Sequence, residues 1–162
     1  AYLRGFGPAT FKDIKWWTGW TSGMTSQALS DAEAVLVEVD GGEAFVAAND
    51  VDDLQTEQWT SFLPGLDPTT MGWKERDWYL DPDQVPWLFD RNGNAGPTVW
   101  MDGRVVGGWA QATDGEIRHQ LFDQEAVARS EEIDAAAERL AEFLGDTRPR
   151  PRFPTPALKD LS

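Results

Sequence analysis

The clearest pattern of hydrophobic and polar positions lies within residues 97–122. Two Asp-Gly pairs, Asp102-Gly103 and Asp114-Gly115, separate three runs that are rich in β-branched and aromatic residues. Asp-Gly favours a tight hairpin because the type I′ turn needs a positive φ at both central positions. The pattern therefore predicts a three-stranded meander, with strands at about residues 98–101, 104–111 and 116–122.

The middle run of this region carries a pair of glycines, Gly107 and Gly108. Glycine inside a strand often marks a bulge, a sharp bend or the close approach of another segment. Large apolar side chains around the pair suit the buried side of a sheet. We therefore expect a bend at the glycine pair and buried side chains at Val99, Val105 and Trp109.

The N-terminal part of the chain shows two helical patterns. Thr10 is a good N-cap, and Asp13 stands at the third position after it, as in a capping box. Gly19 is a typical helix end, so a helix is predicted over residues 10–19. A weaker apolar pattern predicts a second helix over residues 22–32, after a short glycine-containing turn.

A β-hairpin is predicted directly after the second helix. Residues 35–39 form an apolar run typical of a strand, residues 40–42 suit a turn, and residues 43–47 form the return strand. Helix, turn, helix and hairpin is the order of elements in a winged helix, whose helix pair is a known supersecondary motif. We predict a winged-helix domain over residues 1–56.

Residues 57–162 are predicted to form a small antiparallel, β-barrel-like domain. A long helix is predicted at residues 124–144, because Asp123 suits its N-cap and apolar residues recur on one face. Residues 74–80 suit one helical turn. Residues 148–154 alternate Arg and Pro, and we expect this extended tail to lie on the protein's own surface. The predicted fold class is therefore α+β.

Composition narrows the class of protein. Hydrophobic residues make up 41% of the 162 residues, which suits a soluble globular chain, and no apolar run approaches the ~20 residues that cross a bilayer. The net charge of −14 opposes non-specific binding to nucleic acid but allows a local basic patch. The chain has no cysteine and no secretion-signal pattern, so we expect a cytoplasmic protein. It lacks an initiator Met and begins like the last turn of a helix, so we expect part of a longer protein.

Residue chemistry alone identifies no reaction. The single histidine, His119, has no cysteine or second histidine with which to form a metal site. No serine-nucleophile, phosphate-loop or dinucleotide motif occurs. Residues 49–55 are acidic but lack the ligand spacing and closing Glu of a calcium loop, so surface acid is the favoured interpretation. We expect no catalytic residue, metal site or cofactor in this chain.

Three segments resemble a known family over nearly the whole chain and in the same order. They are Tyr2–Thr10 with Asp13, Trp17 and Gly19; Leu63-Pro64 with Asp67, Gly72 and Arg76-Asp77; and Arg91–Asn94 with Pro97–Val99, Asp102–Gly107 and Trp109. The chain thereby resembles the bacterial family of tandem winged-helix proteins that includes DNA glycosylases acting on alkylated bases and interstrand crosslinks. The resemblance implies the C-terminal half of such a protein, with one winged helix followed by a β-barrel-like domain.

The family's catalytic motif is absent from this sequence. The resemblance implies a Gln-x-Gln or Gln-x-Asp pair in an N-terminal region, where amide and carboxyl groups suit a positioned water and a cationic, sugar-like transition state. None of the seven glutamines begins either motif, and the nearest sequence is Gln55-Thr56-Glu57. The catalytic groups are therefore expected outside this chain or missing from the protein, with this chain contributing DNA binding and scaffold.

Candidate DNA contacts follow from residue type in that context. The predicted second helix contains no Lys or Arg. Thr25, Ser26 and Gln27 are its only polar candidates for reading base edges, so we favour a packing role for it. Lys and Arg side chains outside this helix could bind DNA phosphates, and an Asn-Gly loop could enter a groove of the DNA. The candidates are Lys74, Arg76, Arg91, Asn92, Asn94, Arg104 and Arg118. For each, an ordinary surface charge beside a carboxylate is the alternative.

Two further hypotheses come from other classes of function. The charge of −14, the non-basic second helix and the nine tryptophans suit a non-catalytic protein-interaction or regulatory module that does not bind DNA directly. An exposed cluster among the following tryptophans would mark such an interface: Trp16, Trp20, Trp59, Trp73 and Trp78. A small-ligand pocket lined by tryptophan in the β domain is a weaker hypothesis, which requires an apolar cavity with convergent polar groups.

Overall fold

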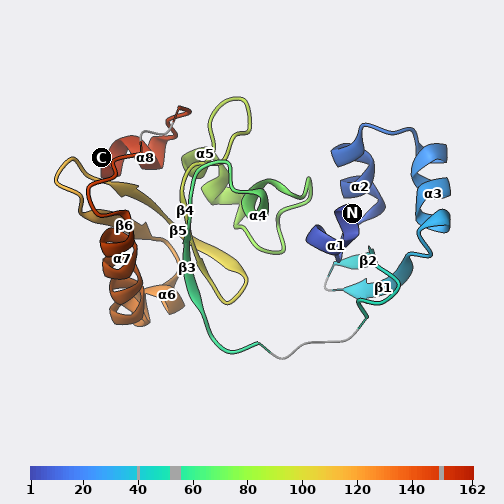
Figure 1. Ribbon diagram of the computed structural model, residues 1–162, viewed down its shortest axis with the longest axis horizontal. Coiled ribbons are helices and arrows are strands. Elements are labelled where there is room, and N and C mark those ends of the chain that lie inside the picture. The colour runs from blue at the N-terminus through green and yellow to red at the C-terminus, as the bar shows by residue number, and fades with distance from the viewer. Residues whose placement is uncertain (40, 52–55, 150–151) are drawn as a thin grey trace. The chain divides into compact units, whose positions relative to one another are not determined.

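The chain forms two compact units in a computed structural model that describes residues 1–39, 41–51, 56–149 and 152–162 (Figure 1). The first unit comprises Ala1–Thr56 together with Gly72–Trp78, and the second comprises Glu57–Met71 together with Tyr79–Ser162. The segment Gly72–Trp78, which we call the strap, therefore packs with residues that lie far from it in the sequence.

The first unit contains the predicted helices and hairpin in the predicted order (Figure 1). The elements are α1 (Tyr2–Phe6), α2 (Phe11–Thr18), α3 (Ser22–Asp31), β1 (Val35–Val39) and β2 (Gly42–Val46). The predicted capping box at the start of α2 is confirmed, because Thr10 and Asp13 each accept a hydrogen bond from the other's backbone N–H. Gly19 ends α2 in the left-handed conformation, with φ 68°. Asp40, which belongs to the predicted turn, lies outside the described residues.

The first unit combines a partly exposed cluster of aromatic rings with a small buried core. Tyr2, Phe6 and Trp17 have ring centroids 5.2–5.4 Å apart, and the Phe6 ring meets Trp73 of the strap edge-on at 5.4 Å. Antiparallel strands β1 and β2 pair Val35 with Val46. The buried hydrophobic side chains of this unit are Ala9, Ile14, Leu29, Ala44, Val46 and Trp73.

The strap is not the helical turn predicted over residues 74–80. Its chain is irregular up to a short turn at residues 77–79. The backbone N–H groups of Lys74 and Glu75 donate to Asp13 Oδ1 at 2.8 and 2.9 Å, so a carboxylate of α2 takes the place of helix carbonyls. Trp73 Nε1 donates to the carbonyl of Phe6 at 3.0 Å. These long-range bonds explain why a local pattern could not predict the conformation.

The second unit is built on an antiparallel sheet of four strands in the order β3-β4-β5-β6 (Figure 1). The strands are β3 (Thr60–Leu63), β4 (Thr98–Met101), β5 (Arg104–Gln111) and β6 (Ile117–Leu121). The last three confirm the predicted meander. The β-barrel-like prediction is wrong for the described residues: β3 and β6 are the two edges of an open sheet and do not pair with each other.

A β-bulge bends the middle strand at the position that the glycine pair predicted. The β4–β5 register shifts between Val99 and Trp100, because Val99 pairs with Gly107 whereas Trp100 pairs with Val105. A Cβ at Gly107 would lie 2.4 Å from the backbone oxygen of Gln120. Glycine therefore allows β6 to approach β5 closely beside the bulge.

The long helix predicted at residues 124–144 is divided in two. Helix α6 (Gln124–Ala128) and helix α7 (Ser130–Leu144) meet at Arg129, whose φ of −106° and ψ of 24° are not helical. Asp123 caps α6 as predicted, accepting from the N–H groups of Glu125 and Ala126. No Gly or Pro marks the break in the sequence. The break coincides with the contacts of the Arg129 side chain described below.

Four shorter elements complete the second unit. They are α4 (Pro68–Met71), the 3₁₀ turn η1 (Pro82–Gln84), α5 (Val85–Leu88) and α8 (Pro156–Leu161). Helix α8 was not predicted, although Thr155 caps it and Pro156 opens it. The Arg148 guanidinium bonds to the carbonyls of Gly145 and Asp114, so this part of the predicted tail contacts the protein's own surface. Arg150 and Pro151 of that tail lie outside the described residues.

Helices cover both faces of the sheet. On one face, apolar side chains of α6 and α7 pack on β4, β5 and β6, with Ile133 of α7 fully buried. On the other face, a Cβ at Gly108 would lie 3.0 Å from Leu88 of α5 and 3.3 Å from Ala157 of α8, so glycine admits both helices. The predicted burial of Val99, Val105 and Trp109 is confirmed.

Candidate nucleic-acid interface

The β4–β5 hairpin turns through Asp102 and Gly103, at φ 47° and φ 85°. Positive φ at both positions is the property of the type I′ turn that the Asp-Gly pair predicted. Asp102 also ties the turn to the chain before β3. Its N–H donates to the carbonyl of Trp59 at 3.1 Å, and its Oδ1 accepts from the Trp59 N–H at 2.7 Å.

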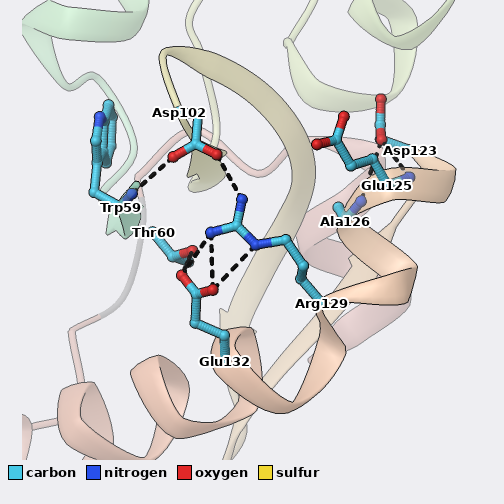
Figure 2. A network of polar contacts seen from close by, with 8 residues as sticks. All are labelled: Trp59, Thr60, Asp102, Asp123, Glu125, Ala126, Arg129 and Glu132. Carbon is cyan, nitrogen blue, oxygen red and sulfur yellow. Dashed lines mark hydrogen bonds and ion pairs between the residues drawn. The ribbon is translucent and has the colours of Figure 1, made fainter. Parts of the chain in front are cut away.

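A polar network holds this hairpin turn to the break between α6 and α7 (Figure 2). Arg129 donates through Nη1 to Asp102 Oδ2 at 2.5 Å and through Nε and Nη2 to Glu132 at 2.8–3.0 Å. Glu132 Oε1 also accepts from the hydroxyl of Thr60 in β3 at 2.9 Å. We call Asp102, Arg129, Glu132, Thr60 and the Trp59 backbone the hairpin anchor.

The hairpin anchor keeps its groups in their charged forms. The hydrogen bond from the Trp59 N–H is the largest effect and lowers the pKa of Asp102. Desolvation opposes it, and the Arg129 guanidinium adds to the lowering. Arg129 and the Thr60 hydroxyl lower the pKa of Glu132, and the two carboxylates raise the pKa of Arg129. The anchor is therefore a fully ionised network at neutral pH.

The loop before β4 is organised around Asp90. Its Oδ1 accepts from the N–H groups of Asn92 and Asn94 at 2.8 and 2.9 Å, and its Oδ2 accepts from the Asn94 side-chain amide at 2.8 Å. These bonds, that of the Asn94 side chain first, lower the pKa of Asp90. The Asn94 amide is thus engaged inside the loop, whereas the side chains of Arg91 and Asn92 are exposed.

The two candidate arginines of the meander lie toward opposite ends of β5. Arg104 begins β5 opposite Met101, and Arg118 of β6 pairs with Ala110 near the other end of the strand. Six residues of strand separate these positions by about 20 Å. Arg118 bonds to Glu116 at 2.9 Å and lies 3.8 Å from Asp114, which raises its pKa, whereas Arg104 is exposed.

The candidate cations of the first unit lie on the strap. Lys74 is exposed beside Glu75 and Asp77, and all three line a groove of about 740 Å³. Arg76 donates through Nε to the carbonyl of Trp73 at 3.1 Å. Lys12 of α2 pairs with Glu75 at 2.6 Å, which raises the pKa of Lys12 and, with the Thr10 hydroxyl, lowers that of Glu75.

Asp13 proves to be the residue that positions the strap. It is 1% exposed, and its Oδ1 accepts from the strap N–H groups of Lys74 and Glu75. Its Oδ2 accepts from the N–H of Thr10 at 3.1 Å and lies 2.7 Å from the Thr10 hydroxyl. The capping pattern predicted only the second pair of contacts, because the strap lies some sixty residues away in the sequence. We call Asp13 with its partners the Asp13 clamp.

The remaining predicted sites have a mixed outcome. Trp73 is buried, whereas Trp16, Trp20, Trp59 and Trp78 are exposed.

A cavity of about 340 Å³ opens beside Trp109, Gln111 and Arg148, and Gln111 Oε1 has no hydrogen-bond partner there. His119 Nε2 lies 3.4 Å from Asp134. Within the described ranges, no three His, Asp or Glu side chains gather as a metal site requires, and no helix is long and apolar enough to cross a membrane.

The chain is similar to a known family of DNA glycosylases. The family model described as DNA glycosylase AlkZ-like matches residues 1–143. The chain belongs to the AlkZ-like DNA glycosylase family. Among solved structures, Streptomyces sahachiroi DNA glycosylase AlkZ is similar, with a TM-score of 0.78 and 25% sequence identity. The match covers 91% of the AlkZ-like chain but 42% of AlkZ, so the chain spans less than half the length of that protein. No curated protein matches the chain.

Proposed function

We propose that this AlkZ-like chain binds DNA and supports the catalytic part of a DNA-repair glycosylase, without supplying catalytic groups itself. The family match over residues 1–143 is the observation that carries this proposal. The chain spans less than half the length of AlkZ, so the proposal assigns it only the binding and scaffold roles and not the whole activity.

In this proposal the first unit is one winged helix of a tandem array. Its support is the order α1, α2, α3, β1 and β2, with the β1–β2 hairpin directly after α3. The domain over residues 1–56 is completed by the strap, which the Asp13 clamp holds against α2. Residues 57–71 and 79–162 form the second domain, an open sheet covered by helices.

The proposed DNA contacts in the second domain differ in how freely they reach a phosphate. Arg104 is exposed directly after a turn that the hairpin anchor holds, and Arg91 and Asn92 are exposed on the Asp90 loop. Arg118 and Asn94 are engaged by neighbouring carboxylates, so they rank below the others. Positioned cations suit phosphates, whereas amide side chains suit groove edges. Lys74 and Arg76 are the proposed contacts of the first domain.

The proposal leaves the chemical step outside this chain. The sequence has no Gln-x-Gln or Gln-x-Asp, and Gln55 of the nearest motif lies outside the described residues. A chain of this kind is expected to bind alkylated duplex DNA without releasing the modified base.

A salt titration tests the proposal. Fluorescence anisotropy of a labelled DNA duplex should give binding whose log K falls linearly with log salt concentration. Arg104→Gln should reduce the magnitude of that slope by about 0.9, because one phosphate contact is lost. Arg118→Gln is the matched control, since Arg118 is paired with Glu116, and should leave the slope nearly unchanged. Binding without salt dependence, or base release by the chain alone, contradicts the proposal.

A second candidate function is a protein-interaction module that does not bind DNA directly. The exposed side chains of Trp16, Trp20, Trp59 and Trp78 favour it, because large exposed aromatics are enriched at protein interfaces. A chain that binds no duplex DNA at low salt, and whose tryptophan substitutions abolish association with another protein, would favour this function over the first.

A further inference from the structure

One face of α2 carries lysines and an exposed tryptophan. Lys12, Lys15 and Trp16 are spaced by three and four residues, so they lie on one side of the helix, and all three are exposed. Trp20 follows Gly19, the residue that caps the end of α2. The side chains of Trp16 and Trp20 are 41% and 39% exposed. We call Lys12, Lys15, Trp16 and Trp20 the α2 face.

The α2 face lies in a positively charged stretch of an otherwise acidic chain. Residues 1–30 contain three basic residues and one acidic residue, whereas the whole chain has a net charge of −14. The acidic residue is Asp13, which is buried and accepts hydrogen bonds from the strap and from Thr10. The exposed charges within this stretch are therefore positive. Glu75 of the strap pairs with Lys12, so Lys15 carries the charge that complements a polyanion.

The lysines of the α2 face remain accessible to a ligand. Lys15 Nζ donates to the hydroxyl of Ser22 at 3.1 Å, a neutral partner at the surface. Lys12 pairs with Glu75, and the two side chains are 58% and 40% exposed; such solvent-accessible pairs contribute little free energy. By contrast, α3 contains no Lys or Arg, so the positive charge of the helix pair is concentrated on α2.

The tryptophan at the centre of the α2 face lies beside a cluster of aromatic rings. The ring of Trp16 lies 6.2 Å from that of Trp17, which in turn packs on Tyr2 and Phe6 at 5.4 and 5.2 Å. A ring held in place in the free protein loses less conformational entropy when it stacks on a ligand. This arrangement suits a stacking platform better than an isolated surface tryptophan would.

We infer that the α2 face binds unpaired nucleotides of single-stranded DNA. Trp16 and Trp20 stack on bases, and Lys15 holds a phosphate. Unpaired bases expose their π faces, whereas the bases of a duplex already stack on each other, so aromatic platforms beside cations favour single strands. The inference rests on the proposed function, in which DNA is the polymer that this chain binds, and it adds a surface distinct from the hairpin.

The test measures binding of a labelled oligothymidylate to the intact chain by fluorescence anisotropy. The double variant Trp16→Ala, Trp20→Ala should weaken binding by about tenfold or more, given the usual effect of removing a stacked aromatic. Lys15→Gln should reduce the magnitude of the slope of log K against log salt by about 0.7, as expected for one phosphate of a single strand. Phe143→Ala, at an 85% exposed position on α7, should bind like the parent chain.

Each result separates this inference from the proposed function. No binding of oligothymidylate by the parent chain, or equal binding by the double variant, overturns the inference; duplex binding that still depends on Arg104 then leaves the proposed function intact. If the double variant instead changes the oligomeric state in light scattering and not DNA binding, the α2 face contacts protein and the inference is wrong. Conversely, tryptophan-dependent binding of oligothymidylate without any Arg104-dependent duplex binding supports the α2 face and contradicts the hairpin proposal.

Discussion

The first unit packs few aliphatic side chains around a buried carboxylate, whereas the second unit packs helices on a sheet through largely apolar contacts. In the first, the strap is held by hydrogen bonds from its backbone to Asp13 and by the ring contact of Trp73. In the second unit, the hairpin anchor is a network of polar contacts outside the apolar core, and it holds the turn between β4 and β5. A small unit with little apolar core thus relies on directional bonds, which specify one geometry but fail together when the shared acceptor is removed.

The largest effect is expected from Asp13→Ala. The substitution removes the buried carboxylate that accepts from the part-buried N–H groups of Lys74, Glu75 and Thr10, and we expect the free energy of unfolding of the first unit to fall by about 4 kcal/mol. Urea unfolding followed by tryptophan fluorescence measures this change. The control is Asp77→Ala, at an exposed position on the same strap, which should change stability little. Equal effects of the two substitutions would show that the clamp is not what holds the strap.

In the second unit, Ile133→Ala removes an apolar contact, as Asp13→Ala removes a polar one in the first unit. Ile133 is fully buried against the sheet, and the cavity left behind should cost about 3 kcal/mol in the free energy of unfolding. Val127→Ala, on the neighbouring helix at an exposed position, is the matched control. If the comparison between the units is correct, this substitution speeds amide hydrogen exchange in the sheet while exchange in α2 and in the β1–β2 hairpin of the first unit stays unchanged.

The β-bulge provides a backbone test of the second unit. Gly107→Ala places a Cβ 2.4 Å from the backbone oxygen of Gln120, so β5 and β6 must separate, at a cost of about 2 kcal/mol. Gly23→Ala in α3 meets no atom within 4 Å and should instead raise stability by about 0.5 kcal/mol, because alanine favours helix. Opposite signs in thermal unfolding are the expected result, and a loss of stability at both sites would contradict it.

The smallest effect is expected from breaking the hairpin anchor with Arg129→Met. The network lies at the surface, so the melting temperature should change little, but the amide of Asp102 should exchange faster with solvent because its turn is no longer held. Ser130→Ala, at the adjacent position, is the control, and its exchange rate at Asp102 should match that of the parent chain.

The anchor also predicts a pH dependence with a definite sign. The folded-state pKa values of Asp102 and Glu132 are lowered, so their contribution is present above the ordinary carboxyl range of about pH 4. It is lost as the pH falls through the lowered folded values, when both carboxyls become protonated. Amide exchange at Asp102, corrected for its intrinsic pH dependence, should accelerate in that acidic range. The Arg129→Met variant should show a weaker dependence, and identical profiles would contradict the role of Arg129.

Sequence reasoning succeeded where the determining contacts are close in the chain. The capping box of Thr10 and Asp13 spans three residues, and the Asp-Gly turns join strands that follow each other directly. The same reasoning failed over residues 74–80 and at Arg129, where a helical pattern competes with contacts from distant segments. The candidate cations were chosen by residue type alone, so the sequence could not distinguish the exposed Arg104 from Arg118, which is paired with Glu116.

The sequence by itself determined these features: a capped helix followed by a second helix and a hairpin, the meander with its glycine bulge, and the positive charge of residues 1–30. Only the tertiary structure decided that Asp13 holds the strap, that Arg129 ends α6 and binds Asp102, and that the sheet stays open. Turns and caps are set by local backbone preferences and short-range hydrogen bonds. The choice of a distant partner for a carboxylate depends on which segments the packed core brings together, and a local pattern does not contain that information.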